Sequence, residues 1–183
     1  VVGFTGRTMS SEDIGAKYIN TPEGLVYHKG KTLYGLDKAK KAIREVGYAV
    51  VVEGNMDVIT CHEAGYKNVV ACSGTALTAD QIQLLKRYTE NIALCFDEDE
   101  AGQAASSRSI DLLLAAEINV KIVKLTCGKD PDECIRTDVK AWEESLKTSK
   151  LVMQFYFDKY LTPEVLADIN KKKPAVATVL KEL

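Results

Sequence analysis

Short apolar runs alternate with helix-like segments through the middle of the chain. Apolar runs occupy residues 48–52, 68–72, 92–96 and 120–125, and helical patterns occupy residues 34–46, 56–64, 78–88 and 103–116. Thr78 and Gln81 form the Thr-x-x-Gln pattern of a capping box at the start of one such helix. Strands that are apolar on both faces and joined by helices are typical of a parallel sheet with right-handed crossovers. The pattern therefore predicts an α/β unit with four parallel strands and flanking helices.

The two ends of the chain have different patterns. Residues 1–7 are typical of the end of a strand, and the glycine-containing stretch up to residue 36 predicts irregular structure and turns. Beyond Pro131 the spacing is helical only, and Pro163 predicts a break between two helices. A chain that opens on apolar strand residues suggests a piece of a longer protein.

The composition is that of a globular protein with one domain and a small appendage. Of the 183 residues, 46% are hydrophobic and 27% are charged, which argues against general disorder and against a small disulfide-stapled scaffold. No apolar run is long enough to span a membrane, and the sequence shows no secretion leader. The five cysteines lack Cys-x-x-Cys spacing, so we expect free thiols in a reducing cytoplasm and no zinc site.

Positive and negative charges are unevenly distributed along the chain. The formal net charge is only -2, which gives the whole chain no basic character. Residues 1–47 nevertheless carry eight Lys or Arg against five acids, whereas acids crowd into residues 90–100. Such mild segregation usually reflects solvated faces alone, so it needs a specific site before it indicates a partner.

Carboxylates follow three of the four predicted strands. The candidates are Glu53, Asp57, Asp97, Asp99, Asp130 and Asp132. Because the carboxyl ends of parallel strands share one edge of a sheet, we expect these side chains to meet there. Clustered like charges require a neutralising cation, and oxygen ligands suit Mg²⁺ or Mn²⁺, which in pairs assist phosphoryl transfer. The alternative for any single acid is a structural one, since helix N-termini also favour Asp and Glu.

Two of these acidic stretches resemble a known domain. They resemble the two acidic motifs of the toprim domain, which bacterial primases, topoisomerases and some nucleases share. The stretches are residues 53–57 (Glu-Gly-Asn-Met-Asp) and 97–102 (Asp-Glu-Asp-Glu-Ala-Gly). Residues 130–133 (Asp-Pro-Asp-Glu) resemble the third acidic element of bacterial DNA primase. The same family is matched, in order, by residues 2–7, 17–23, 28–35 and 73–78. One departure is Asn55, which stands where the family usually has an aromatic residue.

The resemblance implies a DNA-templated RNA polymerase that starts chains without a primer. Glu53, Asp97 and Asp99 would then be the catalytic carboxylates and main ligands of Mg²⁺, for which Mn²⁺ could substitute. Further acids would complete the metal site, namely Asp57, Asp130 and Asp132. Basic residues would contact nucleotide phosphates or the template, namely Arg7, Lys17, Lys29 and Lys31. A basic wall opposite acids that hold a metal suits a polyanion.

The same resemblance implies an organisation and a set of partners. Residues 1–46 would be the C-terminal part of a basic N-terminal subdomain, 47–129 the toprim subdomain and 130–183 a helical C-terminal subdomain. The partners would be single-stranded DNA, ribonucleoside triphosphates, an RNA–DNA hybrid and, through a C-terminal domain outside this chain, the replicative helicase. We expect a cytoplasmic protein at a bacterial replication fork, without a membrane partner. We expect this stretch by itself to be weakly active, because the upstream part of the polymerase domain and the zinc module are absent.

Two alternatives remain open at the level of sequence. One is another toprim phosphoryl-transfer enzyme, a nuclease or a topoisomerase, although no nucleophilic tyrosine on a separate domain is evident. The other is a non-catalytic, receiver-like domain that binds Mg²⁺ through acids at its strand ends. A receiver-like domain would form a labile aspartyl phosphate. This alternative does not explain the basic stretch 1–35 or the acids at 130–132.

Overall fold

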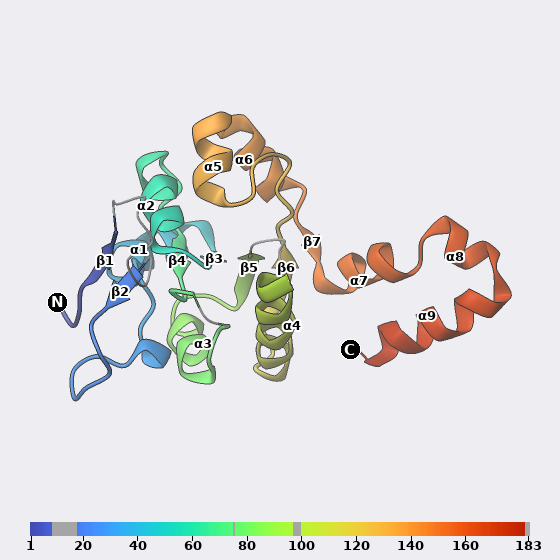
Figure 1. The fold of residues 1–183 in the computed structure, drawn as a ribbon, viewed down its shortest axis with the longest axis horizontal. Coiled ribbons are helices and arrows are strands. Elements are labelled where there is room, and N and C mark those ends of the chain that lie inside the picture. Colours follow the sequence, from blue (N-terminus) through green and yellow to red (C-terminus); the bar gives the residue numbers. More distant parts are fainter. Residues whose placement is uncertain (9–17, 75, 97–99, 182–183) are drawn as a thin grey trace.

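A five-stranded sheet forms the centre of the molecule (Figure 1). The computed structural model describes residues 1–8, 18–74, 76–96 and 100–181, with the side chains of 100–104 outside the description. Four strands are parallel, as the sequence predicts, and their order along the sheet is β4-β3-β5-β6. They are β3 (Ala49–Val52), β4 (Val69–Ala71), β5 (Asn91–Cys95) and β6 (Asn119–Ile122). The α/β fold class is therefore confirmed.

The prediction of a four-stranded sheet is incomplete by one edge strand. β7 (Lys150–Leu151) pairs antiparallel with β6, with Lys121 opposite Leu151 and Ile122 opposite Lys150. Its two residues are both exposed, so the sequence has no buried apolar run there that would predict a strand. The chain reaches β7 through α5 (Pro131–Thr137) and α6 (Val139–Lys147), and β7 then forms the edge of the sheet beside β6.

The N-terminal segment begins with the strand that the sequence predicts within residues 1–7, and a second strand pairs with it where irregular structure was expected. β1 (Thr5–Arg7) pairs antiparallel with β2 (Tyr18–Asn20), in the register Thr5–Asn20 and Arg7–Tyr18. Both strands have three residues, and most of these are exposed. Short exposed strands lack the alternation of buried and exposed residues on which a prediction depends, which explains why β2 was not predicted.

Helices cover both faces of the sheet. One face packs against α1 (Leu36–Val46), α3 (Ala79–Lys86), α4 (Glu100–Ala115) and α7 (Val152–Tyr160). The opposite face packs against α2 (Asn55–Glu63), α5 (Pro131–Thr137) and α6 (Val139–Lys147). All four residues of β3 are fully buried, as expected for a central strand with helices on both sides. The two faces thus form one apolar cluster each, divided by the sheet.

The C-terminal part is helical, in agreement with the sequence pattern. After α7 the chain continues through α8 (Pro163–Ala167) and α9 (Ile169–Lys181), which extend away from the sheet as an arm (Figure 1). The predicted break lies at Pro163, which occupies the first turn of α8 after Thr162 caps it. Within the described part of the chain, every helix is too short or too polar to cross a lipid bilayer.

Candidate metal and nucleotide site

Glu53 and Asp57 lie at the carboxyl end of the central strand β3, as the sequence predicts. Glu53 directly follows the strand and is half-buried, whereas Asp57 in the first turn of α2 is only 6% exposed. The backbone N–H of Gly54 donates a hydrogen bond of 3.1 Å to Asp57 Oδ2. A Cβ at residue 54 would lie 2.7 Å from the same oxygen, so a larger residue here would displace the Asp57 carboxylate.

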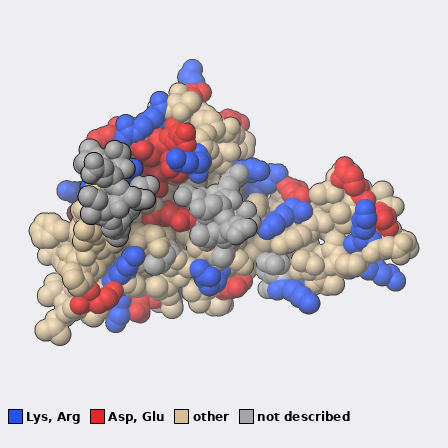
Figure 2. All heavy atoms as spheres, viewed as in Figure 1, with Lys and Arg blue, Asp and Glu red and all other residues tan. Residues whose placement is uncertain are grey.

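The third acidic element meets Asp57 across the structure. The backbone N–H of Asp132, at the start of α5, donates a hydrogen bond of 3.2 Å to Asp57 Oδ1. Asp130 is the N-cap of α5, and its Oδ1 accepts a hydrogen bond of 2.8 Å from the backbone N–H of Glu133. Figure 2 shows acidic side chains gathered on the face where α2 and α5 meet. The structure therefore brings Asp57 and Asp132 together, although they are far apart in sequence.

Thr60 and Arg136 stabilise the ionised form of Asp132. Its Oδ1 accepts hydrogen bonds from Thr60 Oγ1 and, at 2.7 Å, from Arg136 Nε. Partial burial of the carboxyl raises its pKa, but these hydrogen bonds and the charges of Arg136 and Arg7 outweigh burial and lower the pKa below its usual value. Asp132 is thus an anion at neutral pH. Sequence reasoning missed both partners, although Arg136 lies four residues after Asp132, a spacing that favours ion pairs on a helix.

The donor set suits a hard divalent cation. A carboxylate has about four lone-pair sites, so it can accept protein hydrogen bonds and bind a cation at the same time. Carboxylate oxygens are the ligands that Mg²⁺ and Mn²⁺ prefer. Among the described residues, no group of three or more His, Cys, Asp or Glu side chains is arranged to hold a metal ion. Two of the predicted ligands, Asp97 and Asp99, lie outside those residues.

Arg7 lies close enough to the acidic edge to act on it. It belongs to the exposed hairpin strand β1, and its guanidinium lies 5.7 Å from the centre of the Tyr18 ring on β2. Its charge contributes to the lowered pKa of Asp132, so the hairpin brings a cation near the third acidic element. Lys17, another predicted phosphate contact, lies outside the described residues.

Lys29 and Lys31 are part of a short 3₁₀ turn, η1 (Lys29–Lys31), which is held by the start of α3. Thr78 Oγ1 donates to the carbonyl of Gly30 at 2.5 Å, and Gln81 Nε2 donates to the carbonyls of Lys29 at 3.1 Å and Thr32 at 2.8 Å. Lys31 Nζ lies 3.9 Å from a carboxylate oxygen of Asp80. The turn is therefore fixed to the α/β unit.

The predicted capping box of α3 is confirmed. Thr78 Oγ1 accepts a hydrogen bond from the backbone N–H of Gln81, and Gln81 Oε1 accepts one from the N–H of Thr78, both at 3.1 Å. Gln81 is fully buried. Its bonds to η1 are long-range, so the sequence pattern reveals the cap and gives no sign of the tertiary role.

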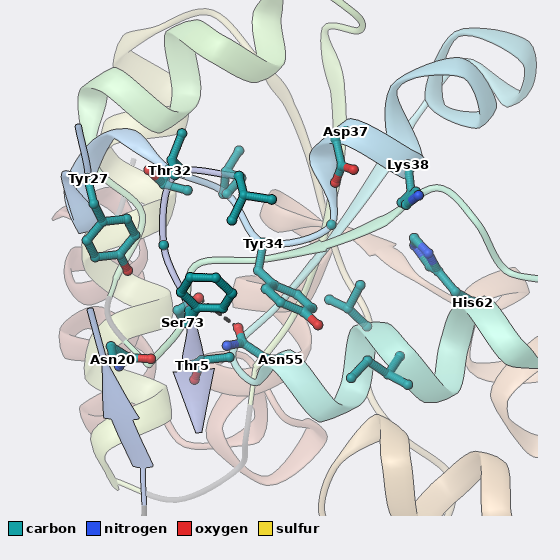
Figure 3. Close-up of a pocket in the computed structure, with 18 of the residues that line it drawn as sticks. Thr5, Asn20, Tyr27, Thr32, Tyr34, Asp37, Lys38, Asn55, His62 and Ser73 are labelled. Atoms are coloured by element: carbon teal, nitrogen blue, oxygen red, sulfur yellow. Dashed lines mark hydrogen bonds between the residues drawn. The ribbon is translucent and has the colours of Figure 1, made fainter. Parts of the chain in front are cut away.

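A cavity of about 960 Å³ lies between the N-terminal hairpin and the helices α1 and α2 (Figure 3). Thr5, Tyr34, Asn55 and Ser73 are among the residues that line it. Ser73 Oγ donates a hydrogen bond of 2.7 Å to Asn55 Oδ1, the residue at the position where an aromatic ring was expected. The lining does not include the predicted metal ligands that the structure describes, so this cavity is separate from the acidic edge.

Comparison with known proteins identifies the relatives of this fold. Residues 50–135 match the sequence family described as Toprim-like, and residues 1–40 match the family described as DNA primase catalytic core, N-terminal domain. The DNA primase of Synechococcus elongatus is 40% identical over 190 residues, which cover 100% of this chain and 27% of that protein.

Solved structures give the same result. The crystal structure of the Aquifex aeolicus primase, with its zinc-binding and RNA polymerase domains, has a TM-score of 0.83 and 35% identity, covering 100% of this chain and 44% of that one. A DnaG primase catalytic domain bound to single-stranded DNA has a TM-score of 0.80 and 32% identity, covering 100% of this chain and 61% of that one.

Fold and acidic edge together define a toprim-like α/β domain. Toprim-like domains occur in several classes of enzyme. Here the toprim-like match follows a match to the N-terminal domain of the primase catalytic core, and similarity to a DNA primase extends along the whole chain. The chain belongs to the DNA primase family. It spans about a quarter of the length of the curated relative and about half of the solved chains.

Proposed function

We propose that this chain is part of the catalytic core of a primase that synthesises short RNA primers on single-stranded DNA. The observation that carries the proposal is the joining of two acidic elements, where the N–H of Asp132 contacts Asp57 beside the end of β3. A cationic hairpin and a cationic turn belong to the same chain, which suits an anionic substrate. The match to a DnaG catalytic domain bound to single-stranded DNA supports DNA as the template.

In the proposed reaction, a ribonucleotide 3′-hydroxyl attacks the α-phosphate of an incoming ribonucleoside triphosphate and pyrophosphate leaves. We propose that Glu53, Asp97 and Asp99 are the main ligands of Mg²⁺, and that Asp57, Asp130 and Asp132 complete the anionic site. Bound Mg²⁺ would neutralise charge that develops on the phosphate oxygens. Mn²⁺, with similar ligand preferences, is expected to replace it.

The chain's own residues would position the reactants. Arg7 offers a planar guanidinium for phosphate, and Lys29 and Lys31 offer point charges. We propose the same role for Lys17. Because Gln81 and Thr78 fix the carbonyls of η1, the two lysines have a defined place relative to α3. Gly54 permits the backbone to pass close to Asp57, which keeps that carboxylate at the end of β3.

The organisation and partners of the longer protein follow from the same proposal. Residues 1–46 are proposed to be the C-terminal part of a basic N-terminal subdomain, 47–129 the toprim subdomain and 130–183 a helical C-terminal subdomain. The family matches at 1–40 and 50–135 support a division near residue 46, and the second match extends six residues past residue 129. We propose that the complete protein works in the bacterial cytoplasm with an RNA–DNA hybrid and a replicative helicase, which would bind through a region outside this chain.

A nucleotidyl-transfer assay tests the proposal. The assay measures extension of an RNA primer on single-stranded DNA by the chain with ribonucleoside triphosphates and Mg²⁺. We expect weak, metal-dependent extension that Glu53→Gln reduces at least tenfold, whereas Asp111→Asn, which changes an exposed acid on α4, leaves it unchanged. Equal extension by Glu53→Gln and the unmodified chain would contradict the proposal. A labile aspartyl phosphate would instead favour the receiver-like alternative.

A further inference from the structure

Two cysteine thiols face each other across the turn that carries the third acidic element. Cys127 Sγ and Cys134 Sγ are 3.1 Å apart, and both cysteines are free. The residues between them include Asp130 and Asp132. A disulfide requires its sulfur atoms about 2.05 Å apart, so a relative movement of about 1 Å would bring these two to bonding distance.

The turn itself holds the thiols in place. Gly128 has a left-handed conformation with φ 71°, and a Cβ there would lie 2.7 Å from the backbone nitrogen of Cys134. The backbone N–H of Lys129 donates a hydrogen bond of 3.1 Å to Glu133 Oε2, and the N–H of Cys134 donates one of 3.0 Å to the carbonyl of Asp130. The approach of the two sulfurs therefore results from a closed, hydrogen-bonded turn.

The two cysteines differ in exposure. Cys127 is partly exposed and meets solvent, whereas Cys134 is fully buried beneath it. An oxidant in solution reaches Cys127 first, and the buried Cys134 is the adjacent thiol that can resolve the product.

We propose that Cys127 and Cys134 form a reversible oxidation site for peroxides. Cys127 sulfur attacks the O–O bond of hydrogen peroxide, which yields a sulfenic acid on Cys127 and one molecule of water. Cys134 sulfur then attacks the sulfenic sulfur, the S–S bond forms, the S–O bond breaks and a second water leaves with the remaining thiol proton. Two thiols lose two electrons in total and one peroxide is reduced, while a dithiol reverses the reaction. In a reducing cytoplasm the bond would be transient.

Disulfide formation alters the acidic turn. The approach of about 1 Å between the sulfurs has to be absorbed by the residues that carry Asp130 and Asp132. A binding site requires its groups within about 0.5 Å of the productive geometry, so oxidation is expected to weaken divalent-metal binding at least twofold. This effect on metal binding rests on the proposed function, whereas formation of the disulfide does not.

Peptide mapping tests the disulfide directly. The chain is reduced, oxidised with hydrogen peroxide, alkylated and digested with trypsin, which cleaves after Lys124, Lys129 and Arg136. We expect a disulfide-linked pair of the peptides 125–129 and 130–136, which dithiothreitol separates. The pair should persist in Cys61→Ala, which removes a buried thiol from the same apolar cluster. It should vanish in Cys127→Ser and in Cys134→Ala.

Other products would overturn the proposal. A bridge to Cys61, a bridge between two chains, or sulfinic acid on Cys127 without a bridge would each contradict the site. Circular dichroism shows whether Cys134→Ala folds, and Cys127→Ser supplies an independent test at a less buried position. Equal Mn²⁺ affinity before and after a mapped oxidation would overturn the effect on the acidic turn while leaving the disulfide and the proposed function in place.

Discussion

Gln81 joins the basic turn η1 to the α/β unit, so its replacement tests how the two parts are held together. The side chain makes three hydrogen bonds, to the carbonyls of Lys29 and Thr32 and from the N–H of Thr78. Gln81→Leu keeps the bulk of the side chain and leaves these backbone groups without that partner. A hydrogen bond contributes about 1 kcal/mol net, and a buried group left unpaired costs about 1–3 kcal/mol. We expect Gln81→Leu to lower the free energy of unfolding by about 2–4 kcal/mol.

Gln81→Glu isolates the two bonds to η1. Glutamate keeps an oxygen that accepts from Thr78 N–H, but at neutral pH its other oxygen faces the carbonyls of Lys29 and Thr32. Burial beside carbonyl oxygens raises the pKa of such a carboxyl above its unfolded value, which is about 4.3. Its contribution to stability is therefore greatest at low pH and is lost as pH rises through the raised folded pKa.

Urea unfolding followed by circular dichroism measures both effects. The matched control is Gln83→Leu, two residues further along α3, where the side chain is exposed. Trypsin cleavage after Lys29 and Lys31 should also be faster in Gln81→Glu than in the control, because local release of η1 exposes the turn. A loss below 1 kcal/mol in Gln81→Leu, or equal cleavage of Gln81→Glu and control, would refute this account of η1.

Two further predictions concern the turn that carries Asp132. Arg136→Met should raise the pKa of Asp132 towards its unfolded value. The lowered pKa of Asp132 stabilises the fold at pH values above the unfolded pKa, and this stability is lost as pH falls through the folded pKa. In urea unfolding the variant should therefore be less stable than wild type at pH 7, and the difference should shrink as the pH falls below the unfolded pKa. A stability difference independent of pH would contradict the ion pair. Gly128→Ala should destabilise the fold more than Gly47→Ala in thermal unfolding. Both glycines have positive φ, which costs an alanine about 1–2 kcal/mol at either position. Of the two, only residue 128 would also place its Cβ against backbone, 2.7 Å from the nitrogen of Cys134. Equal losses in the two variants would contradict the crowding.

The four parallel strands could be predicted because each is buried on both faces, as in β3, where every residue is apolar and inaccessible. β7 could not, because its two exposed residues are fixed by pairing with β6 and carry no periodicity. β2 was not predicted for the same reason, whereas β1 lies within residues 1–7, which the sequence marks as the end of a strand. Strands whose residues contribute to the core are visible in sequence, whereas strands defined only by edge pairing are not.

The candidate site was predictable in its acids and not in its supporting contacts. Strand ends of a parallel sheet place carboxylates on one edge, so Glu53 and Asp57 could be located from sequence order. The contact between Asp57 and Asp132 requires α2 and α5 to pack together, which local pattern does not encode. Thr60 and Arg136 were missed because their role depends on the same packing. The metal-binding roles of the acids stay predictions.

Titration of the chain with Mn²⁺, with and without a ribonucleoside triphosphate, tests whether the acidic edge binds metal together with nucleotide. Free Mn²⁺ is measured by electron paramagnetic resonance for the unmodified chain, for Asp97→Ala and for the control Asp111→Ala. We expect nucleotide to strengthen Mn²⁺ binding, Asp97→Ala to abolish this gain, and the control to keep it. Binding that is indifferent to nucleotide and to Asp97 would contradict a nucleotidyl-transfer site at the acidic edge of the sheet.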